Sequence, residues 1–207
     1  MEKIVIVGCG GHAKTIVDMI EAHGQYEIAG FVDTLPDAAY DYRGYKIIAT
    51  DANAGKLYDA GIRNAVIGVG MMGNSVVREK IYAAYKKIGF SFPTIIDPSA
   101  VLAADVEIGE GTVVGKLAVI NSAATIGCMA IINTAAIIEH DCMIGNHSHV
   151  SVGAVLCGNA KVGRGTFVGA NSTVIQGIEI GNHVVIGAGS TVINNVMDNE
   201  KKMGLVK

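Results

Sequence analysis

The sequence predicts an α/β domain in roughly its first hundred residues and a parallel β-helix in the remainder. Three observations support this fold class. A repeat with a period of six residues begins at Leu102, strands and amphipathic segments alternate before it, and the 207 residues include 27 glycines but only 3 prolines. So little proline is unlike a disordered low-complexity chain, whereas frequent glycine suits a backbone with many regularly placed turns.

Length and composition narrow the class of protein. A chain of 207 residues can form two small domains. It contains no run of about 18 apolar residues, and Gly and His interrupt its first apolar stretch, so we expect neither membrane insertion nor a signal peptide. The formal charge of −3 gives no reason to expect nucleic acid. The cysteines lack C-x-x-C pairing, which favours reduced thiols and a cytoplasmic protein.

The N-terminal elements follow from periodicity. Residues 3–22, "KIVIVGCGGHAKTIVDMIEA", predict an apolar strand, a glycine-rich turn and an amphipathic helix, and residues 26–33 predict a second strand that ends in Asp33. Strands that alternate with helices predict a parallel sheet, here in a Rossmann-like domain spanning residues 1–98. The remaining strands and helix of this domain are expected at 45–50, 64–70, 75–90 and 92–97.

The glycine-rich turn is a candidate phosphate site. Gly8, Gly10 and Ala13 match the pattern G-x-G-x-x-G/A. The unit is about one mononucleotide-binding half, so we favour a nucleotide diphosphate over a dinucleotide, although an NAD-dependent enzyme and a purely structural turn stay open. Such a turn brings backbone N–H groups and a helix N-terminus to an anion. The substrate-binding candidates here are Gly8, Gly10, Gly11, His12 and Asp33.

The second half of the chain, residues 99–207, carries the sixfold repeat. A strict period of six fits neither a helix nor a simple alternating strand, and hexapeptide repeats are typical of a parallel β-helix. Each aliphatic residue is expected to fill the interior, and the mostly small residue two places before the next one is expected to pack near a corner. The aliphatic positions are Leu102, Ile108, Val114, Ile120, Ile126, Ile132, Ile138, Ile144, Val150, Leu156, Val162, Val168, Val174, Ile180, Ile186 and Val192.

Hexads such as "IGEGTV" and "VGRGTF" resemble those of the hexapeptide-repeat acyltransferases. The pairing of "VGCGGHAKTIVDMIE" with "IIEHDCMIGNHSHVSVGAVLCGN" is more specific, and resembles bacterial sugar acetyltransferases that include sialic acid O-acetyltransferases and N-acetyltransferases of nucleotide-linked 4-amino sugars. The resemblance implies a left-handed β-helix, a homotrimer with sites between subunits, an N-terminal domain that holds a sugar nucleotide, and acetyl-CoA as co-substrate without a metal. It also implies a role in bacterial surface glycan synthesis.

Three adjacent ionisable residues lie between two aliphatic positions of the repeat. Ile138 and Ile144 point inward, so Glu139, His140 and Asp141 can face outward instead of being buried at high cost. Acetyl transfer needs a base and an orienter for that base, and histidine and a neighbouring carboxylate suit these roles. We therefore expect His140 to be the base and Asp141 its orienter, with Glu139 as the lesser candidate.

The resemblance implies further site residues. It places His149 at the acetyl-CoA site, the backbone N–H of Gly158 near the thioester, and Asn133 at the sugar. Gly187 and Gly189 of "IGAGST" are further candidates for the acetyl-CoA site.

Other functions stay open from the sequence. Sialic acid O-acetylation would use the same base. A trimeric β-helix zinc carbonic anhydrase would use three histidines, for which His140, His147 and His149 are available. A sugar-nucleotide sensor or scaffold without catalysis is the non-enzymatic alternative.

Overall fold

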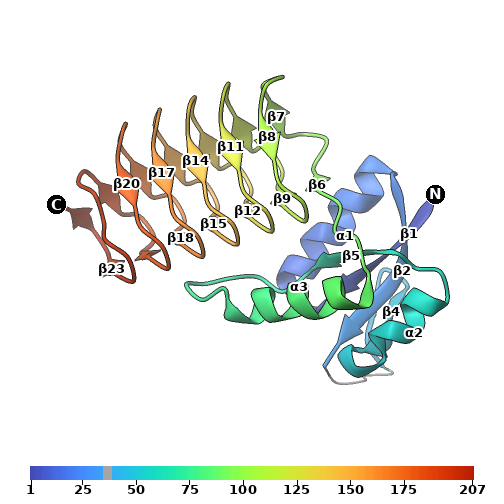
Figure 1. Cartoon of the computed structure of the whole chain (residues 1–207). Coiled ribbons are helices and arrows are strands. Elements are labelled where there is room, and N and C mark those ends of the chain that lie inside the picture. Colours follow the sequence, from blue (N-terminus) through green and yellow to red (C-terminus); the bar gives the residue numbers. More distant parts are fainter. Residues whose placement is uncertain (35–38) are drawn as a thin grey trace. The chain divides into compact units, whose positions relative to one another are not determined.

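The computed structural model describes residues 1–34 and 39–207. The chain folds into two compact units. The first comprises Met1–Gly70 and Val76–Pro93, and the second comprises Met71–Ser75 and Thr94–Lys207 (Figure 1).

In the first unit the described residues form a five-stranded sheet with the order β3-β4-β2-β1-β5. The strand β1 is central and pairs in parallel with β2 and with β5, and β2 pairs in parallel with β4. Among the described residues of this sheet, the short hairpin between β3 and β4 is the only antiparallel pairing. The strands are β1 (Glu2–Val7), β2 (Tyr26–Asp33), β3 (Asp41–Tyr42), β4 (Tyr45–Thr50) and β5 (Asn64–Ile67).

The helix α1 (Gly11–His23) follows β1 directly, as the sequence predicted. It buries Ala13, Ile16, Val17 and Ile20, whose spacing forms one apolar stripe. The helix ends at Gly24, which adopts φ +69° and donates its N–H to the carbonyl of Ile20. A left-handed glycine that satisfies a late carbonyl is a common way to end a helix.

Two further helices complete the first unit. The helix α3 (Val76–Ile88) confirms the predicted amphipathic segment, whereas the 3₁₀ turn η1 (Asp51–Asn53) and α2 (Ala54–Asp59) were not predicted. The expected strand at 92–97 does not join this sheet. Its core is β6 (Ile95–Ile96), which pairs with β9 of the second unit. The long segment of the second unit therefore begins at Thr94, a few residues before the boundary expected at 99.

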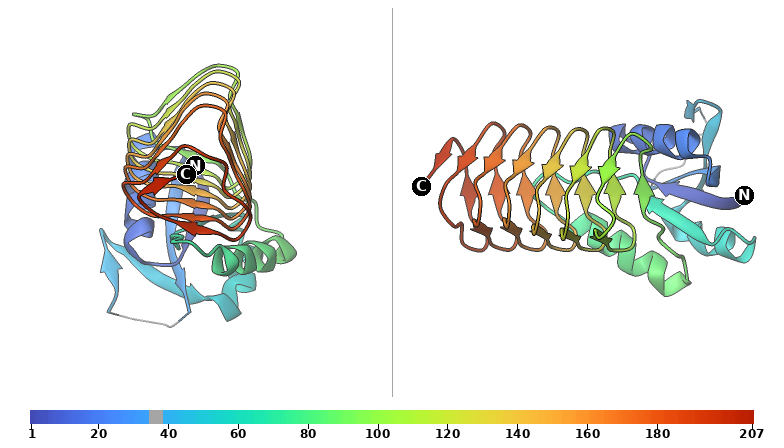
Figure 2. Two further views of the ribbon diagram at one scale, coloured as in Figure 1. Left: turned by 90° about the vertical axis from the view of Figure 1, so that its left-hand side faces the viewer. Right: turned by 90° about the horizontal axis from the view of Figure 1, so that it is seen from above.

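Three parallel sheets form the walls of the second unit. Paired strands are 18 residues apart along most of each sheet, so three hexads make one coil (Figure 2). The β6 sheet contains β6, β9 (Val113–Val114), β12 (Ile131–Ile132), β15 (His149–Val150), β18 (Phe167–Val168), β21 (Val185–Ile186) and β23 (Lys201–Lys202). The β7 sheet contains β7 (Val101–Leu102), β10 (Val119–Ile120), β13 (Ile137–Ile138), β16 (Val155–Leu156), β19 (Thr173–Val174), β22 (Thr191–Val192) and β24 (Leu205–Val206). The β8 sheet contains β8 (Glu107–Ile108), β11 (Thr125–Ile126), β14 (Met143–Ile144), β17 (Lys161–Val162) and β20 (Glu179–Ile180).

The aliphatic repeat fills the interior of the coils. From Val114 to Val192 every aliphatic position is buried, and the small residues near the corners, such as Ala136 and Cys142, are fully buried as well. Ile96 lies six residues before Leu102 and packs against the same core, so the repeat begins one hexad earlier than predicted. The packing of one coil on the next buries the aliphatic surface that a single coil would expose to solvent.

The corners of the coils share a backbone feature that the letters of the sequence do not show. A residue with φ between +54° and +70° occurs at every sixth position from Gly111 to Gly189. Several of these residues are not glycine, including Leu117, Ala123 and Met129. The left-handed conformation costs such residues about 1–2 kcal/mol each, so coil stacking must offset that cost.

The glycines that follow the aliphatic residues have a different role. At Gly163, for example, an added Cβ would lie 2.5 Å from the carbonyl carbon of Gly181 in the next coil. Gly145 and Gly169 meet the backbone of the next coil at similar distances. These positions require glycine because adjacent coils approach closely there.

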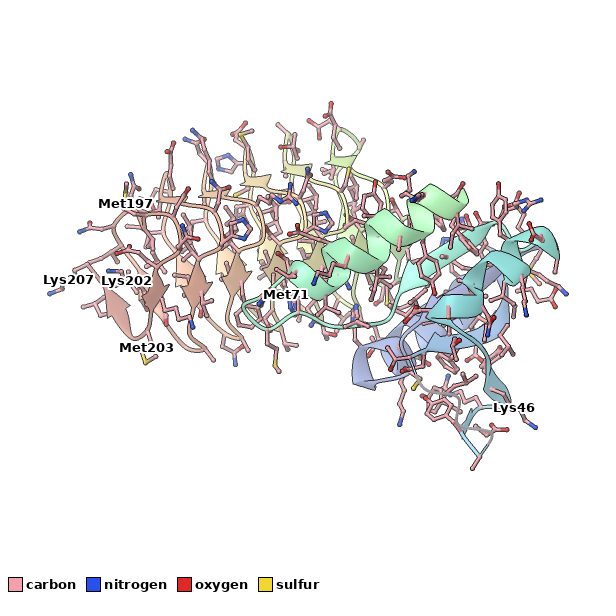
Figure 3. The ribbon with its side chains drawn as sticks, turned by 60° about the horizontal axis from the view of Figure 1, so that its bottom comes forward. Lys46, Met71, Met197, Lys202, Met203 and Lys207 are labelled. Carbon is pink, nitrogen blue, oxygen red and sulfur yellow. The ribbon has the colours of Figure 1, made fainter. Side chains whose placement is uncertain are left out.

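The segment Met71–Ser75 packs along the β6 sheet. The carbonyl of Met71 meets His149 of β15, and Gly73 lies against Val185 of β21. At the far end of the coils, Met197 and Met203 are exposed, near Lys202 and Lys207 (Figure 3).

Candidate active site

The ionisable triplet lies at the corner between β13 and β14. Asp141 occupies the left-handed position of this corner with φ +60°, and its N–H bonds the carbonyl of Ser122 in the preceding coil. The imidazole Nδ1 of His140 lies 2.8 Å from Asp141 Oδ2. The side chains of His140 and Asp141 are 63% and 59% exposed. The triplet is thus presented outward, and Asp141 holds one ring nitrogen of His140.

The pKa of His140 is raised above its ordinary value of 6.5. The largest cause is the hydrogen bond to Asp141, and the negative charges of Asp141 and Glu139 add to it, while slight burial acts in the opposite direction. When the ring is neutral, Nδ1 donates to the carboxylate and Nε2 keeps its lone pair. This arrangement suits a general base.

Gly158 lies against the outer edge of the same imidazole. A Cβ added at Gly158 would be 2.6 Å from both Cε1 and Nε2 of His140. None of the residues that the structure describes accepts a hydrogen bond from the backbone N–H of Gly158. The carbonyl of Gly158 accepts from the N–H of Gly177 at 3.0 Å. His140 and Gly158, two site candidates from the sequence, therefore lie next to each other.

His149 and Asn133 form a second cluster, on the β6 sheet side of the coils. The ring of His149 is buried, with Nδ1 2.6 Å from the carbonyl oxygen of Met71 and Nε2 3.1 Å from Nδ2 of Asn133. It also makes an edge contact with Phe167. Asn133 Oδ1 accepts the N–H of Thr134 at 2.8 Å.

This second cluster and the His140 corner stand at opposite ends of β13, since Asn133 precedes this strand and His140 follows it. One chain therefore presents the two groups on different corners of its coils.

The remaining acetyl-CoA candidates lie nearer the C-terminal end of the coils. Gly187 follows β21 and donates its N–H to the carbonyl of Lys202, while Gly189 has φ +68° and open space where a side chain would be. A groove of about 740 Å³ follows the β8 sheet and is lined by Thr125, Met143 and Lys161 among others. Met143, which opens β14 two residues after Asp141, contributes to this lining.

The glycine-rich turn connects β1 to α1 as predicted. Gly8 has φ +94°, and a Cβ there would lie 2.7 Å from Val69 Cγ2. Gly10 precedes the first turn of α1, where Gly11 is exposed and His12 is half-buried. The first turn of α1 carries no acidic side chain. Backbone N–H groups at such a helix start suit an anion.

Asp33 fastens this turn. Its Oδ2 accepts both the N–H and the thiol of Cys9, each at 3.0 Å, and its Oδ1 accepts the N–H of Thr34 at 2.7 Å. Burial on its own would raise the pKa of Asp33, but the hydrogen bonds from Cys9 and Thr34 outweigh that effect and hold the pKa below its ordinary value. The hydroxyl of Tyr40 donates to the Cys9 carbonyl, which holds the turn from the other side.

Two residues that support this turn were not expected from the sequence. A Cβ at Gly68 would lie 2.7 Å from Cβ of Ala13, so this glycine lets α1 approach β5 closely. Arg78 is fully buried, donates to the carbonyls of Ile67 and Val69, and keeps its charge at neutral pH although burial lowers its pKa to about 10. The only signals in the sequence were a glycine after an apolar run and a charged residue on a helix, and both are common.

Sequence families match both units. The PglD N-terminal domain family matches residues 3–85. The bacterial transferase hexapeptide family, with six repeats, matches residues 159–194, and the hexapeptide repeat of succinyl-transferase matches residues 135–168.

Solved structures cover nearly the whole chain. A variant of the GDP-perosamine N-acetyltransferase of Caulobacter crescentus, in complex with CoA and GDP-perosamine, is 32% identical, with a TM-score of 0.93 over 99% of this chain and 94% of that one. The chain belongs to the hexapeptide-repeat sugar acetyltransferase family. The acetyltransferase domain of PglB from Neisseria gonorrhoeae, in complex with acetyl coenzyme A, is 28% identical with a TM-score of 0.88 over 98% of this chain and 96% of that one.

Family membership confirms the predicted order of a Rossmann-like α/β domain and a left-handed parallel β-helix. A curated family member, the UDP-N-acetylbacillosamine N-acetyltransferase of Bacillus subtilis (strain 168), is 34% identical over 114 residues. That alignment spans 55% of this chain and 51% of the B. subtilis enzyme.

Three further observations concern the cysteines, membrane-spanning helices and metal-binding groups of the chain. None of the four cysteines, all of which lie in the described ranges, forms a disulfide. No helix in the described ranges combines the length and apolarity needed to span a bilayer. Within residues 1–34 and 39–207, no group of three or more His, Cys, Asp or Glu side chains is arranged to hold a metal ion.

Proposed function

We propose that this chain transfers the acetyl group of acetyl-CoA to the amino group of a nucleotide-linked amino sugar. The observation that carries the proposal is the exposed His140–Asp141 pair, whose ring edge lies on Gly158, in a chain that matches N-acetyltransferases over nearly its full length. One of these relatives was crystallised with CoA and GDP-perosamine after a single histidine had been replaced by alanine or by asparagine.

In the proposed reaction His140 Nε2 removes a proton from the attacking amine. The amine nitrogen forms a bond to the carbonyl carbon of the thioester, and the carbon–sulfur bond then breaks. The proton passes to the departing thiolate, so the products are the N-acetyl sugar and CoA. Asp141 holds Nδ1 and stabilises the protonated ring, while Glu139 adds negative charge nearby.

The backbone N–H of Gly158 is the proposed donor to the thioester oxygen. This oxygen becomes negatively charged in the tetrahedral intermediate, and a preoriented N–H next to the base stabilises it. Loss of one such donor costs other enzymes roughly 10²–10³-fold in rate.

We assign the sugar nucleotide to the glycine-rich turn, with its diphosphate at Gly8 to His12 and the start of α1. Gly10 and Gly11 are exposed there, and Asp33 fixes the shape of the turn through Cys9. Asn133 is the proposed contact to the sugar. His149, Gly187 and Gly189 are proposed to border acetyl-CoA, which would lie along the outer wall of the coils.

The active form is proposed to be a homotrimer in the cytoplasm. Asn133 and His140 stand at opposite ends of β13 in one chain, so a site that uses both takes them from two neighbouring chains. Sedimentation should show a trimer, and an active stable monomer would contradict this arrangement.

The acceptor can be identified with a panel of compounds. UDP- and GDP-linked 4-amino sugars should be compared with free and CMP-linked sialic acid, with CoA release and product mass as readouts. N-acetylation predicts CoA release only with the amino sugars, whereas release with sialic acids alone would replace the proposal by O-acetylation. Cys9, Cys128 and Cys157 are partly exposed and can react with thiol reagents, so a reaction without acceptor is the required blank.

The role of the base is tested by His140→Ala. Removal of a general base is expected to lower the rate by roughly 10²–10⁴-fold. Full activity of the variant would remove the mechanism.

A further inference from the structure

We propose that Gly158 is a positioning residue for His140: its bare Cα forms the seat on which the imidazole rests. The inference rests on the proposed function of His140 as the base. It is separate from the role of the Gly158 N–H, because it concerns the missing side chain and not the backbone donor.

The ring of His140 is held from two sides. Asp141 Oδ2 accepts from Nδ1 at 2.8 Å on one side. On the other, the Cβ position of Gly158 would be 2.6 Å from Cε1 and Nε2 and 3.3 Å from Cδ2. A real Cβ cannot approach carbon or nitrogen that closely, so the ring occupies space that exists only because residue 158 is glycine.

This glycine differs from three glycines that follow the aliphatic residues elsewhere in the coils. At Gly145, Gly163 and Gly169 an added Cβ would meet the backbone of the next coil, which cannot move without disturbing the stack. At Gly158 the atoms in the way belong to the end of one exposed side chain. The cheapest response to a methyl group there is rotation of the His140 ring, so the fold should survive.

Rotation of the ring has two consequences for the base. It moves Nε2 away from its place, and it disturbs the Nδ1 contact with Asp141 that raises the pKa of His140. Because a misplacement of about 1 Å can cost an enzyme roughly 100-fold in rate, the variant Gly158→Ala should lose activity through a displaced base.

The test uses Gly158→Ala with Gly177→Ala as a matched control. Gly177 lies in the neighbouring coil, has open space at its Cβ position, and has φ +70°, a conformation close to the one that Ala123 and Ala135 adopt in the same chain. The control keeps the N–H that bonds the Gly158 carbonyl. Gly158→Ala should lower kcat roughly 100-fold with the same KM values and thermal unfolding midpoint, whereas Gly177→Ala should keep its kcat.

A double variant separates the seat from other roles of Gly158. In a His140→Ala background no ring remains to be displaced, so adding Gly158→Ala should leave the residual rate unchanged. A further loss of the same size in that background would show that Gly158 acts independently of His140 and would overturn the inference. Wild-type activity of Gly158→Ala, or its failure to fold, would overturn it as well.

An NMR titration of His140 gives a readout that does not depend on catalysis. Gly158→Ala should lower the pKa of His140 toward its ordinary value, because the bond to Asp141 is weakened, and Gly177→Ala should not. If His140→Ala proves fully active, the proposed base is wrong, and the titration still decides whether Gly158 seats the ring. An unchanged His140 titration in Gly158→Ala would reject the seat.

Discussion

The side-chain nitrogen Nδ2 of Asn133 lies 3.1 Å from Nε2 of His149, and together with the Met71 carbonyl this contact identifies the tautomer of a buried histidine. The carbonyl oxygen of Met71, 2.6 Å from Nδ1, can only accept, so Nδ1 carries the hydrogen. Nε2 is then free to accept from Asn133. Met71, His149 and Asn133 thus form a chain of hydrogen bonds that aims the Asn133 amide.

Replacement of His149 by Phe should destabilise the protein and weaken acceptor binding. Phenylalanine keeps the aromatic contact with Phe167, but it leaves the carbonyl of Met71 and the amide of Asn133 without their partner. A buried polar group left unsatisfied costs about 1–3 kcal/mol. Chemical denaturation should show a loss in this range, and the KM for the sugar nucleotide should rise. Equal stability and KM in the variant would contradict the hydrogen-bond chain, as would nitrogen NMR shifts that place the hydrogen on Nε2.

Asp141→Asn should move the pH profile of the reaction. The carboxylate raises the pKa of His140, and the base is active when neutral, so the wild-type rate should fall as pH drops through a value above 6.5. Asparagine removes the charge, so the acid limb should move to lower pH. The plateau should fall by roughly 10²–10⁴-fold because the ring loses its orienter.

The raised pKa of His140 also makes the stability of the fold depend on pH in a defined direction. Because the pKa of His140 is higher in the folded than in the unfolded protein, its protonation stabilises the fold below about pH 6.5. This stabilisation is lost as pH rises through the folded-state pKa. The pair is largely exposed, so unfolding midpoints of wild type and Asp141→Asn should differ little. A profile of kcat/KM against pH that is unchanged in Asp141→Asn would argue against this carboxylate as the orienter.

Asp33→Ala should act on binding and not on the chemical step. The substitution removes the acceptor that holds the N–H and thiol of Cys9, so the glycine-rich turn loses its shape. We expect a higher KM for the sugar nucleotide with nearly the same kcat at saturation. The control is Asp59→Ala, at the end of α2 away from this turn. A fall in kcat at unchanged KM would place Asp33 in the chemistry instead.

Gly163→Ala should destabilise the coils strongly. Its Cβ would lie 2.5 Å from the carbonyl carbon of Gly181, and neither backbone can yield without separating two coils. Overpacking of a tight interior costs about 1–3 kcal/mol or more. The thermal unfolding midpoint should drop further in Gly163→Ala than in Gly177→Ala, where the added methyl group has open space and only the left-handed backbone at φ +70° is strained. Equal midpoints would mean that the coils can separate locally without penalty.

The sequence predicted the coils well, because the inward residues Ile138 and Ile144 obey a strict period and determine that Glu139 to Asp141 face outward. It was wrong about residues 92–97, since a short apolar run shows that a strand exists but not which sheet it joins. It could not reveal the left-handed backbone at Leu117, a residue that rarely adopts it.

The site was only partly visible in the sequence. The contact of His140 with Asp141 follows from adjacency. The contact of His140 with Gly158 follows from the coil length of 18 residues, which the strand pairing of the structure shows. The hydrogen bond between His149 and Met71 joins residues 78 positions apart. It forms because the segment Met71–Ser75 belongs to the second unit, whereas the residues on either side of it belong to the first. No local pattern announces such a contact.

The 18-residue coil constrains how this chain can change in length during evolution. Deletion of one residue inside the stack would turn every later aliphatic residue outward. It would also shift each later corner out of register with the corners of the preceding coils. Duplication of one whole coil would instead restore every pairing and lengthen the wall by a single layer. Insertions and deletions within the stack should therefore be confined to complete coils, or to loops that leave a corner and re-enter the coil in the same register.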